Sequence, residues 1–252
     1  MFKFRSGPGD HPIQRAVFEF LVIVTGVLVA LAVDEWRQER AEIRELNQHL
    51  ISLLDEVESN LESITYIRVS LTQVKIPGLE TVIAHLESGE TTVDDADEFL
   101  KAFADSTLLA VSWFARNRFD ALKNSGSLRM LDPDIAGDIS SAFEAPEILL
   151  PQVVRLQGGY PVFAQQFIPA DDQSELNSLR YYLVDTTAPE FVFDISADEA
   201  IDLIHENRDE LLLLARGEAA AVTANWYALK RLEIEFSALK ELLESQIVAH
   251  QG

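Results

Sequence analysis

The pattern of apolar and polar positions sets one segment of the chain apart from the rest. An apolar run, FLVIVTGVLVALAV from Phe20 to Val33, has carboxylates on both sides. Extended back through Ala16, it covers 18 positions, or about 27 Å of helix, which just reaches the length that crosses the hydrocarbon core of a bilayer. We therefore expect a transmembrane helix at residues 16–33, after a short basic N-terminal segment at residues 1–15.

Three explanations of the apolar run are open: an uncleaved membrane anchor, a cleaved signal peptide and a buried helix of a soluble domain. Ala30-Leu31-Ala32 has the A-x-A form of a signal-peptidase site, but no helix breaker stands between Gly26 and that site. Ten Leu, Ile, Val or Phe residues in the run contribute about −0.3 to −0.6 kcal/mol each to insertion. They outweigh Glu19, because an acid near the end of a span costs less than one at its centre. The sequence favours the anchor.

The flanks and the interior of the span contain five residues with expected roles. Arg15 and Glu19 lie one helical turn apart on one face and both reach the interface, while Trp36 supplies an aromatic anchor at the other interface. Gly26 and Ala30 form a small-x-x-x-small pair, and spans associate where small residues let backbones approach. We therefore expect a homo-oligomer that packs partly through Gly26 and Ala30, with Glu19 as an intramembrane acid.

Location follows from the charges around the span. Lys and Arg side chains are balanced, three before the span and three soon after it, so the positive-inside rule gives only a weak direction. A short basic start followed by a long acidic region is typical of a single anchor whose N-terminus is cytoplasmic. We expect a single-pass protein of a bacterial inner membrane, with residues 34–252 in the periplasm.

Helical periodicity continues beyond the span. Apolar residues spaced by three and four cover residues 46–74, with a stutter after Val57, and Pro77-Gly78 is expected to end this helix. A second, coiled-coil-like stripe covers residues 229–247 inside a helix expected at residues 206–249. The two helices match in length, about 65 Å each, so an antiparallel pair buries both stripes.

Shorter elements connect the two long helices. Helices are expected at residues 79–86, 94–105, 113–124 and 133–143, the last of them after the start signal Asp132-Pro133. A less regular region follows up to residue 195, where FVFDI is too short to establish a sheet. The fold class is therefore all-α: an acidic helical bundle at residues 34–252 that stands on one transmembrane helix.

Composition excludes several function classes. The chain has 42 Asp and Glu against 20 Lys and Arg, a formal net charge of −22, which opposes nucleic-acid binding. No cysteine is present, so thiolate nucleophiles and cysteine-based zinc sites are excluded. The five histidines include no H-x-x-x-H pair, and neither a metal site nor a cofactor site is indicated.

Three short motifs have structural explanations that outweigh chemical ones. The acids of residues 94–98 suit the first turn of a helix and lack the glycine of a calcium loop. Ser125-Gly126-Ser127 is interpreted as a turn between helices, with Gly126 in the left-handed conformation. Gly158-Gly159 lacks a phosphate-binding context. We expect no catalytic residue.

A resemblance is carried by two segments, EFLVIVTGVLVALAVDEWRQER and FDALKNSGSLRMLDPDIAGDIS. Together they resemble a family of uncharacterised bacterial proteins with a single N-terminal span, a long following helix and a helical outer domain. The resemblance covers about two thirds of the chain and implies this topology, with no catalytic residue. The chain departs from the family at Asp34-Glu35, where less acidic residues are expected.

Two function classes follow from these observations. The first is a non-enzymatic, membrane-anchored scaffold that assembles with copies of itself or with another envelope protein. The second is a ligand-sensing helical bundle that acts through a separate signalling partner. For the sensor, the aromatic residues Tyr160, Phe163, Phe167, Tyr181 and Tyr182 could line a pocket between helices, although core packing is the favoured interpretation.

Overall fold

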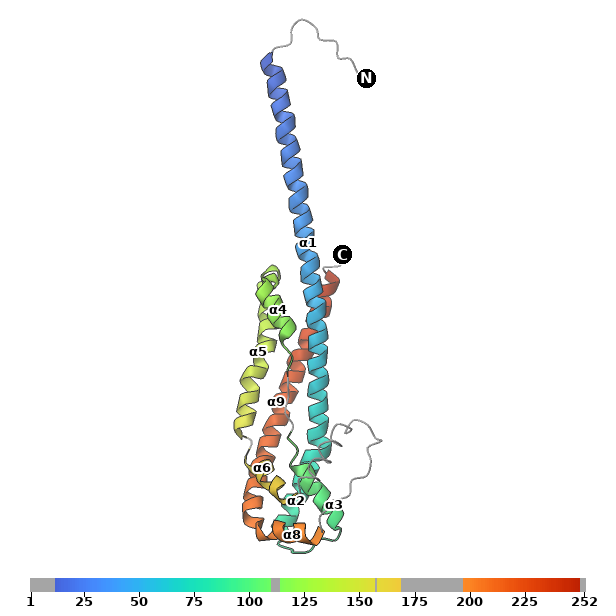
Figure 1. Cartoon of the computed structure of the whole chain (residues 1–252), viewed down its shortest axis with the longest axis vertical. Coiled ribbons are helices and arrows are strands. Elements are labelled where there is room, and N and C mark those ends of the chain that lie inside the picture. The colour runs from blue at the N-terminus through green and yellow to red at the C-terminus, as the bar shows by residue number, and fades with distance from the viewer. Residues whose placement is uncertain (1–11, 110–113, 157, 169–196, 250–252) are drawn as a thin grey trace.

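The computed structural model describes residues 12–109, 114–156, 158–168 and 197–249, which form an elongated helical bundle (Figure 1). In chain order, the elements are α1 Pro12–Ser70, η1 Leu71–Lys75 (a π-helix), α2 Ile76–Ser88, α3 Ala96–Ser106, α4 Asn117–Ser125, η2 Ser127–Met130 (3₁₀), α5 Pro133–Leu156, α6 Tyr160–Ala164, η3 Gln165–Phe167 (3₁₀), α8 Ala197–Glu206 and α9 Arg208–Ala249. The described residues include no β-strand, which confirms the predicted all-α class; FVFDI lies outside them.

The two long helices run antiparallel, as their stripes predicted. Four ion pairs connect the first long helix to α9, and the α9 partner moves toward lower numbers as the first helix advances: Glu58 with Lys240, Arg68 with Glu233, Lys75 with Glu218, and Glu87 with Arg216. The C-terminal end of α9 consequently lies beside the middle of α1, and the N-terminal part of α1 extends beyond the bundle (Figure 1).

Both apolar stripes form the core. The buried stripe residues are Leu46, Leu50, Leu53, Val57, Ile64, Ile67 and Leu71 on the first helix and Leu229, Leu232, Phe236, Leu239 and Leu243 on α9. Aromatic rings join further helices to this core. Phe143 of α5 stacks on Phe119 of α4 at 4.7 Å between ring centroids and lies 5.5 Å from Phe236. The helical periodicity therefore identified most core positions, while Leu61 and Ile247 of the stripes are only partly buried against the core.

The predicted end of the first long helix at Pro77-Gly78 is wrong. One helix continues through both residues to Ser88. In η1, just before the proline, the N–H of Ile76 donates to the carbonyl oxygen of Leu71, five residues back. A proline ring in a regular α-helix clashes with the carbonyl four residues earlier, and the wider π turn gives this ring room. Pro77 is therefore accommodated and does not end the helix.

Gly78 allows α2 and α3 to pack backbone against backbone. A Cβ atom at this position would lie 2.5 Å from the carbonyl oxygen of Ala102 and 2.8 Å from the backbone nitrogen of Ser106. Both distances are shorter than real Cβ contacts, and both atoms belong to the backbone, which cannot swing away. The glycine that looked like a helix breaker is thus a packing residue.

α5 is longer than expected. It begins where Asp132-Pro133 predicted, with Asp132 Oδ1 accepting the N–H of Asp134 at 2.9 Å, but it runs past residue 143 and through Pro146 and Pro151 to Leu156. A proline inside a helix costs about 3 kcal/mol. α5 packs along α9 over this stretch, and that packing outweighs the cost.

Candidate functional site

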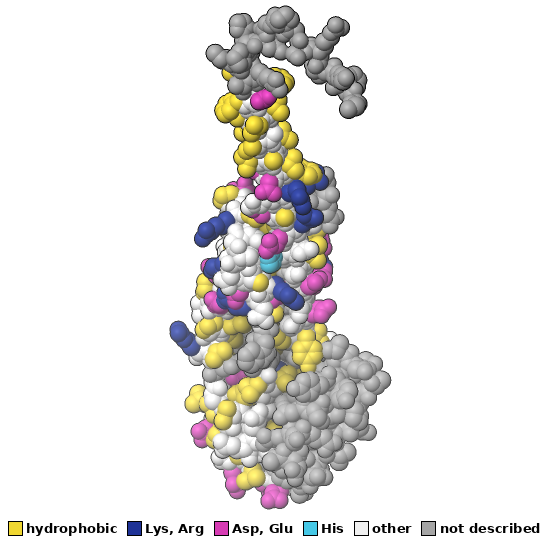
Figure 2. Space-filling model, turned by 45° about the horizontal axis from the view of Figure 1, so that its top comes forward, with side chains coloured by type: hydrophobic (Ala, Val, Ile, Leu, Met, Phe, Trp, Pro, Cys, Tyr) yellow, Lys and Arg dark blue, Asp and Glu magenta, His cyan; other side chains and the backbone are white. Residues whose placement is uncertain are grey.

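The N-terminal part of α1 is apolar and uncovered. Within the described residues, the continuous helix Val17–Ser88 is long and apolar enough to cross a membrane, and its apolar window is 0% buried by the rest of the chain. Phe18 and Ile23 are 68% and 66% exposed, and Figure 2 shows a hydrophobic surface around this end. A core helix of a soluble domain buries such side chains, whereas this helix leaves them exposed, which favours a membrane span over a core helix. A signal sequence has the same apolar composition and the same position near the N-terminus, so exposure does not separate it from an anchor.

The three residues predicted to lie inside the span, Glu19, Gly26 and Ala30, share one face of this helix. At about 100° per residue, Glu19, Gly26 and Ala30 lie within about 40° of one another, on the side opposite Leu46 and Leu50, which face the bundle. A Cβ atom on Gly26 meets nothing within 4 Å. The face that contains Gly26 and Ala30 therefore points away from the side of α1 that packs in the bundle.

The predicted interface anchors are Trp36 and Arg15, and the structure describes the side chain of Trp36. Trp36 is 53% exposed, and the Arg40 guanidinium lies 4.6 Å from the centre of its ring. Arg15 belongs to α1, but its side chain lies outside the described part of the structure. From residue 34 to residue 45 every side chain of α1 is exposed, but Ala41, Arg44 and Glu45 line a hollow together with α4 residues. The neck between the apolar segment and the bundle is therefore residues 34–40, about 10 Å of helix.

A buried polar cluster of Lys75, Ser106, Tyr160 and Glu218 joins η1, α3, α6 and α9. The Lys75 and Glu218 side chains are 2% and 1% exposed; Lys75 Nζ lies 2.5 Å from Glu218 Oε1 and donates to the carbonyl oxygen of Leu108 at 2.7 Å. The hydroxyls of Ser106 and Tyr160 are 2.6 Å apart. Burial, opposed by the Ser106 hydrogen bond and reinforced by the charge of Glu218, raises the pKa of Tyr160, so this phenol stays protonated.

The cluster is a structural feature that sequence reasoning missed. Glu218 Oε2 is buried and has no hydrogen-bond partner in the described part of the chain, which makes the carboxylate dependent on Lys75. In the sequence, both residues look like ordinary charged positions of amphipathic helices. The available signals were their positions: Lys75 follows Leu71 by four residues, and Glu218 lies at helical spacing between Ala215 and Val222.

Glu56 and Asn60 form a second missed arrangement. Glu56 is 6% exposed, and its carboxylate accepts the N–H groups of Arg118 and Phe119 at 2.9 to 3.0 Å. A carboxylate from α1 therefore caps the first turn of α4, where no side chain of α4 itself does so. Asn60, 1% exposed, bonds both the N–H and the carbonyl oxygen of Ala115 at 2.9 Å. The stutter after Val57 marks these polar positions.

A histidine pair connects α2 and α8. The Nε2 atoms of His85 and His205 are 2.8 Å apart, so one ring must donate and the other accept. Burial, and then the charge of His205, lowers the pKa of His85, while Glu90 acts in the opposite direction. Two ring nitrogens alone do not make a strong metal site, and no group of three or more His, Asp or Glu in the described residues could hold a metal ion.

The motifs interpreted as structural have structural roles. Asp95 caps α3 by accepting the N–H of Glu98 at 3.0 Å, and Gly126 adopts φ 82° after α4. Tyr160 is fully buried, and Phe163 and Phe167 pack against the core, which confirms the core-packing interpretation for these three. Tyr181 and Tyr182 lie outside the described residues.

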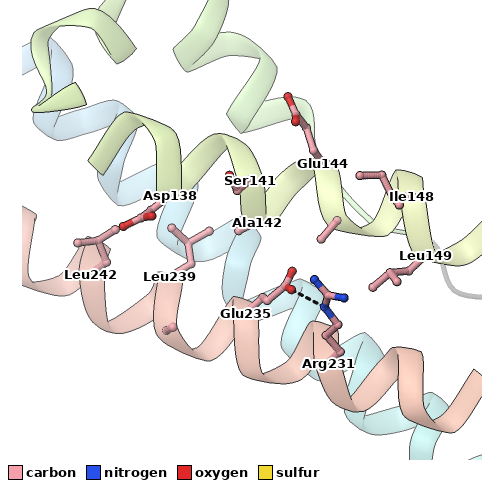
Figure 3. Close-up of a pocket in the computed structure, with 12 residues that line it drawn as sticks. Asp138, Ser141, Ala142, Glu144, Ile148, Leu149, Arg231, Glu235, Leu239 and Leu242 are labelled. Atoms are coloured by element: carbon pink, nitrogen blue, oxygen red, sulfur yellow. Dashed lines mark hydrogen bonds and ion pairs between the residues drawn. The ribbon is translucent and has the colours of Figure 1, made fainter. Parts of the chain in front are cut away.

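A groove of about 730 Å³ lies between α5 and α9 (Figure 3). Its walls combine apolar and acidic side chains, and its lining residues are Asp138, Ser141, Ala142, Glu144, Ala145, Ile148, Leu149, Arg231, Glu235, Ala238, Leu239 and Leu242. The groove belongs to the outer bundle and was not predicted, because it depends on how two helices far apart in sequence diverge.

Comparison with protein-family models, with curated proteins and with solved structures finds no match for this chain. The apolar segment of α1 and the surfaces of the bundle are therefore the features that bear on function.

Proposed function

We propose that this protein is a non-enzymatic, membrane-anchored helical scaffold whose outer bundle assembles with copies of itself or with another envelope protein. The observation that carries the proposal is the apolar segment of α1, which the rest of the chain leaves uncovered. Exposed to water, this surface would be a severe aggregation hazard, and a lipid bilayer covers all sides of the helix at once. The bilayer is thus its natural partner.

The proposed arrangement places residues 16–33 in a bacterial inner membrane, the N-terminus in the cytoplasm and the acidic bundle in the periplasm. The exposed neck at residues 34–40 is a continuous helix, so it acts as a stiff spacer of about 10 Å between bilayer and bundle. A stiff spacer suits a protein that presents an interaction surface at a defined height.

Self-association through the span agrees with the shape of the molecule. Because Gly26 and Ala30 face away from the side of α1 that packs in the bundle, two spans can meet there without a collision between bundles. Two anchored copies are parallel by necessity, so Gly26 of one copy meets Gly26 of the next. The net charge of −22 opposes nucleic acid as a partner.

Cross-linking in native membranes tests this assembly. Gly26→Leu keeps the span apolar and forces the backbones apart, and we expect it to reduce cross-linked oligomers at least about five-fold. The matched control is Ala32→Leu, a small-to-large change about 120° away around the helix, which should leave cross-linking unchanged. Equal cross-linking of the parent and Gly26→Leu, or a parent that is monomeric throughout, would contradict association through the span.

A ligand sensor is the second candidate, because the groove between α5 and α9 falls within the usual volume range of small-molecule sites. Native mass spectrometry of the purified full chain separates the two functions. A bound small molecule at one equivalent per chain supports the sensor, whereas a ligand-free chain that retains protein partners supports the scaffold.

A further inference from the structure

The groove between α5 and α9 has an apolar floor and an open top. Ala142, Ala145 and Leu239 form the floor and are 6%, 9% and 3% exposed. The alanine side chains are small, and Leu149 and Leu239 line the groove from opposite helices (Figure 3). Ile148 stands at the edge and is 60% exposed. Such a trough, bounded by two helices, has the shape that accepts a third helix.

The apolar surface extends beyond the groove along α9. Tyr227, Ala238 and Leu242 lie on one face of that helix, at spacings that repeat with the helical period. Tyr227 is 64% exposed and lies one turn before Arg231, which enters the groove. Arg231 and Glu235 lie between Tyr227 and Ala238, so apolar residues occupy the two ends of a helix face about four turns long, which is longer than a small molecule needs and suits a helical segment.

The rim of the groove is acidic. Asp138 and Glu144 of α5 are exposed there, and Glu235 of α9 accepts a hydrogen bond from Arg231 Nε at 2.9 Å. Because the Arg231 and Glu235 charges compensate each other, the rim retains the two carboxylates of α5. A second copy of this chain has a net charge of −22 and would add repulsion, whereas Lys and Arg on a partner would complement this rim.

We propose that this groove is the docking site for an amphipathic helix of a partner protein, with apolar residues at i, i+3, i+4 and i+7 and with Lys or Arg beside them. The inference rests on the proposed scaffold function and names the partner class of the bundle. From residue 138 to residue 149, α5 spans about 17 Å, which matches three turns of the bound helix. Ile148 and Leu149 contact its apolar face, and Asp138 and Glu144 pair with its basic side chains.

The test uses the full chain in zwitterionic lipid nanodiscs and a fluorescent model peptide of about 14 residues, a Leu/Lys amphipathic helix. An identical pattern of Leu and Glu is the charge control, and empty nanodiscs measure binding to lipid. The decisive variants are Ile148→Asp and Val154→Asp, two equally exposed apolar positions of α5, 60% and 62%, of which only Ile148 lines the groove.

The two variants separate docking from general attraction to an acidic surface. If the peptide docks in the groove, Ile148→Asp lowers its affinity at least about 10-fold, because an apolar contact is lost and a carboxylate is placed in the trough. Val154→Asp then changes the affinity less than about two-fold. General electrostatic attraction predicts instead that both variants bind slightly more tightly. That result, or equal binding of the Leu/Glu peptide, would overturn the proposal.

A second copy of the chain is the remaining occupant, and the same variants address it. If Ile148→Asp abolishes cross-linked oligomers of the full chain in native membranes while Val154→Asp does not, the groove binds another copy and the partner-helix assignment is wrong. The groove proposal is tested by the difference between Ile148→Asp and Val154→Asp in a chain that keeps residues 1–33, whereas the membrane anchor is tested by the intact mass and sedimentation of the parent, so failure of one is distinguishable from failure of the other.

Discussion

Removing one charge of the buried pair Lys75–Glu218 is expected to destabilise the bundle far more than removing both. The side chains are 2% and 1% exposed, and Lys75 is the ammonium that compensates the Glu218 carboxylate. Lys75→Met leaves that carboxylate buried without its ion-pair partner, at a cost of about 3–5 kcal/mol. Glu218→Leu strands the ammonium at a similar cost. In a domain of this size, about 3–5 kcal/mol lowers the Tm by roughly 6–20 °C.

The double variant makes the prediction sharp. Lys75→Met with Glu218→Leu fills the same volume with apolar groups, and such replacements are typically neutral or stabilising, so the Tm should return to within a few degrees of the parent. Far-UV circular dichroism of the purified full chain in detergent measures all four proteins. Lys240→Met, which removes one charge of the exposed pair with Glu58, is the control and should change the Tm little. A double variant whose Tm falls by the sum of the two single losses would show that the two charges do not compensate each other.

Three further predictions concern packing, capping and protonation. Gly78→Ala should lower the free energy of unfolding by about 1–3 kcal/mol, because the added Cβ meets backbone atoms of α3. The control Gly217→Ala has open space in α9 and should raise the free energy of unfolding by up to about 1 kcal/mol. Equal effects of the two variants in thermal melts would contradict the close approach of α2 and α3. Glu56→Ala should lower the free energy of unfolding by about 2 kcal/mol because it uncaps α4, and Glu56→Gln should lower it less. Amide hydrogen exchange should increase first in residues 117–125, and unchanged exchange there would argue against the cap. The pKa of His85 is lowered in the folded state, so the folded chain binds a proton there less readily than the unfolded chain does. The fold therefore loses stability as the pH falls below about 6.5. His205→Gln removes the like charge, and its Tm relative to the parent should be higher at about pH 5 than at about pH 8; a pH-independent difference would exclude this coupling.

The parts of the fold that the sequence predicted are those that depend on periodicity within one helix. Leu46, Leu50 and Leu53 repeat at helical spacing, and burying such a stripe requires a long partner helix, which α9 supplies. Asp132-Pro133 marked the start of α5, and Gly126 marked a left-handed turn, because both signals act through their own backbone.

The parts that sequence reasoning missed depend on neighbours from elsewhere in the chain. Gly78 looks like a breaker until α3 is placed against it, and the continuation through Pro77 depends on the π turn before it. His85 and His205 are 120 residues apart, and nothing local indicates that they meet. The groove likewise results from the divergence of α5 and α9, which leaves no mark on the pattern of either helix.

The most direct test of the membrane-anchored account is the intact mass of the protein in carbonate-washed membranes. If residues 16–33 are an uncleaved anchor, the parent sediments with the membranes at the mass of the whole 252-residue chain. Ala32→Leu, which removes a small residue of the A-x-A site, should then behave identically. A parent found in the soluble fraction with Val33 as its first residue, together with an Ala32→Leu variant that alone keeps residues 1–32, would contradict the account.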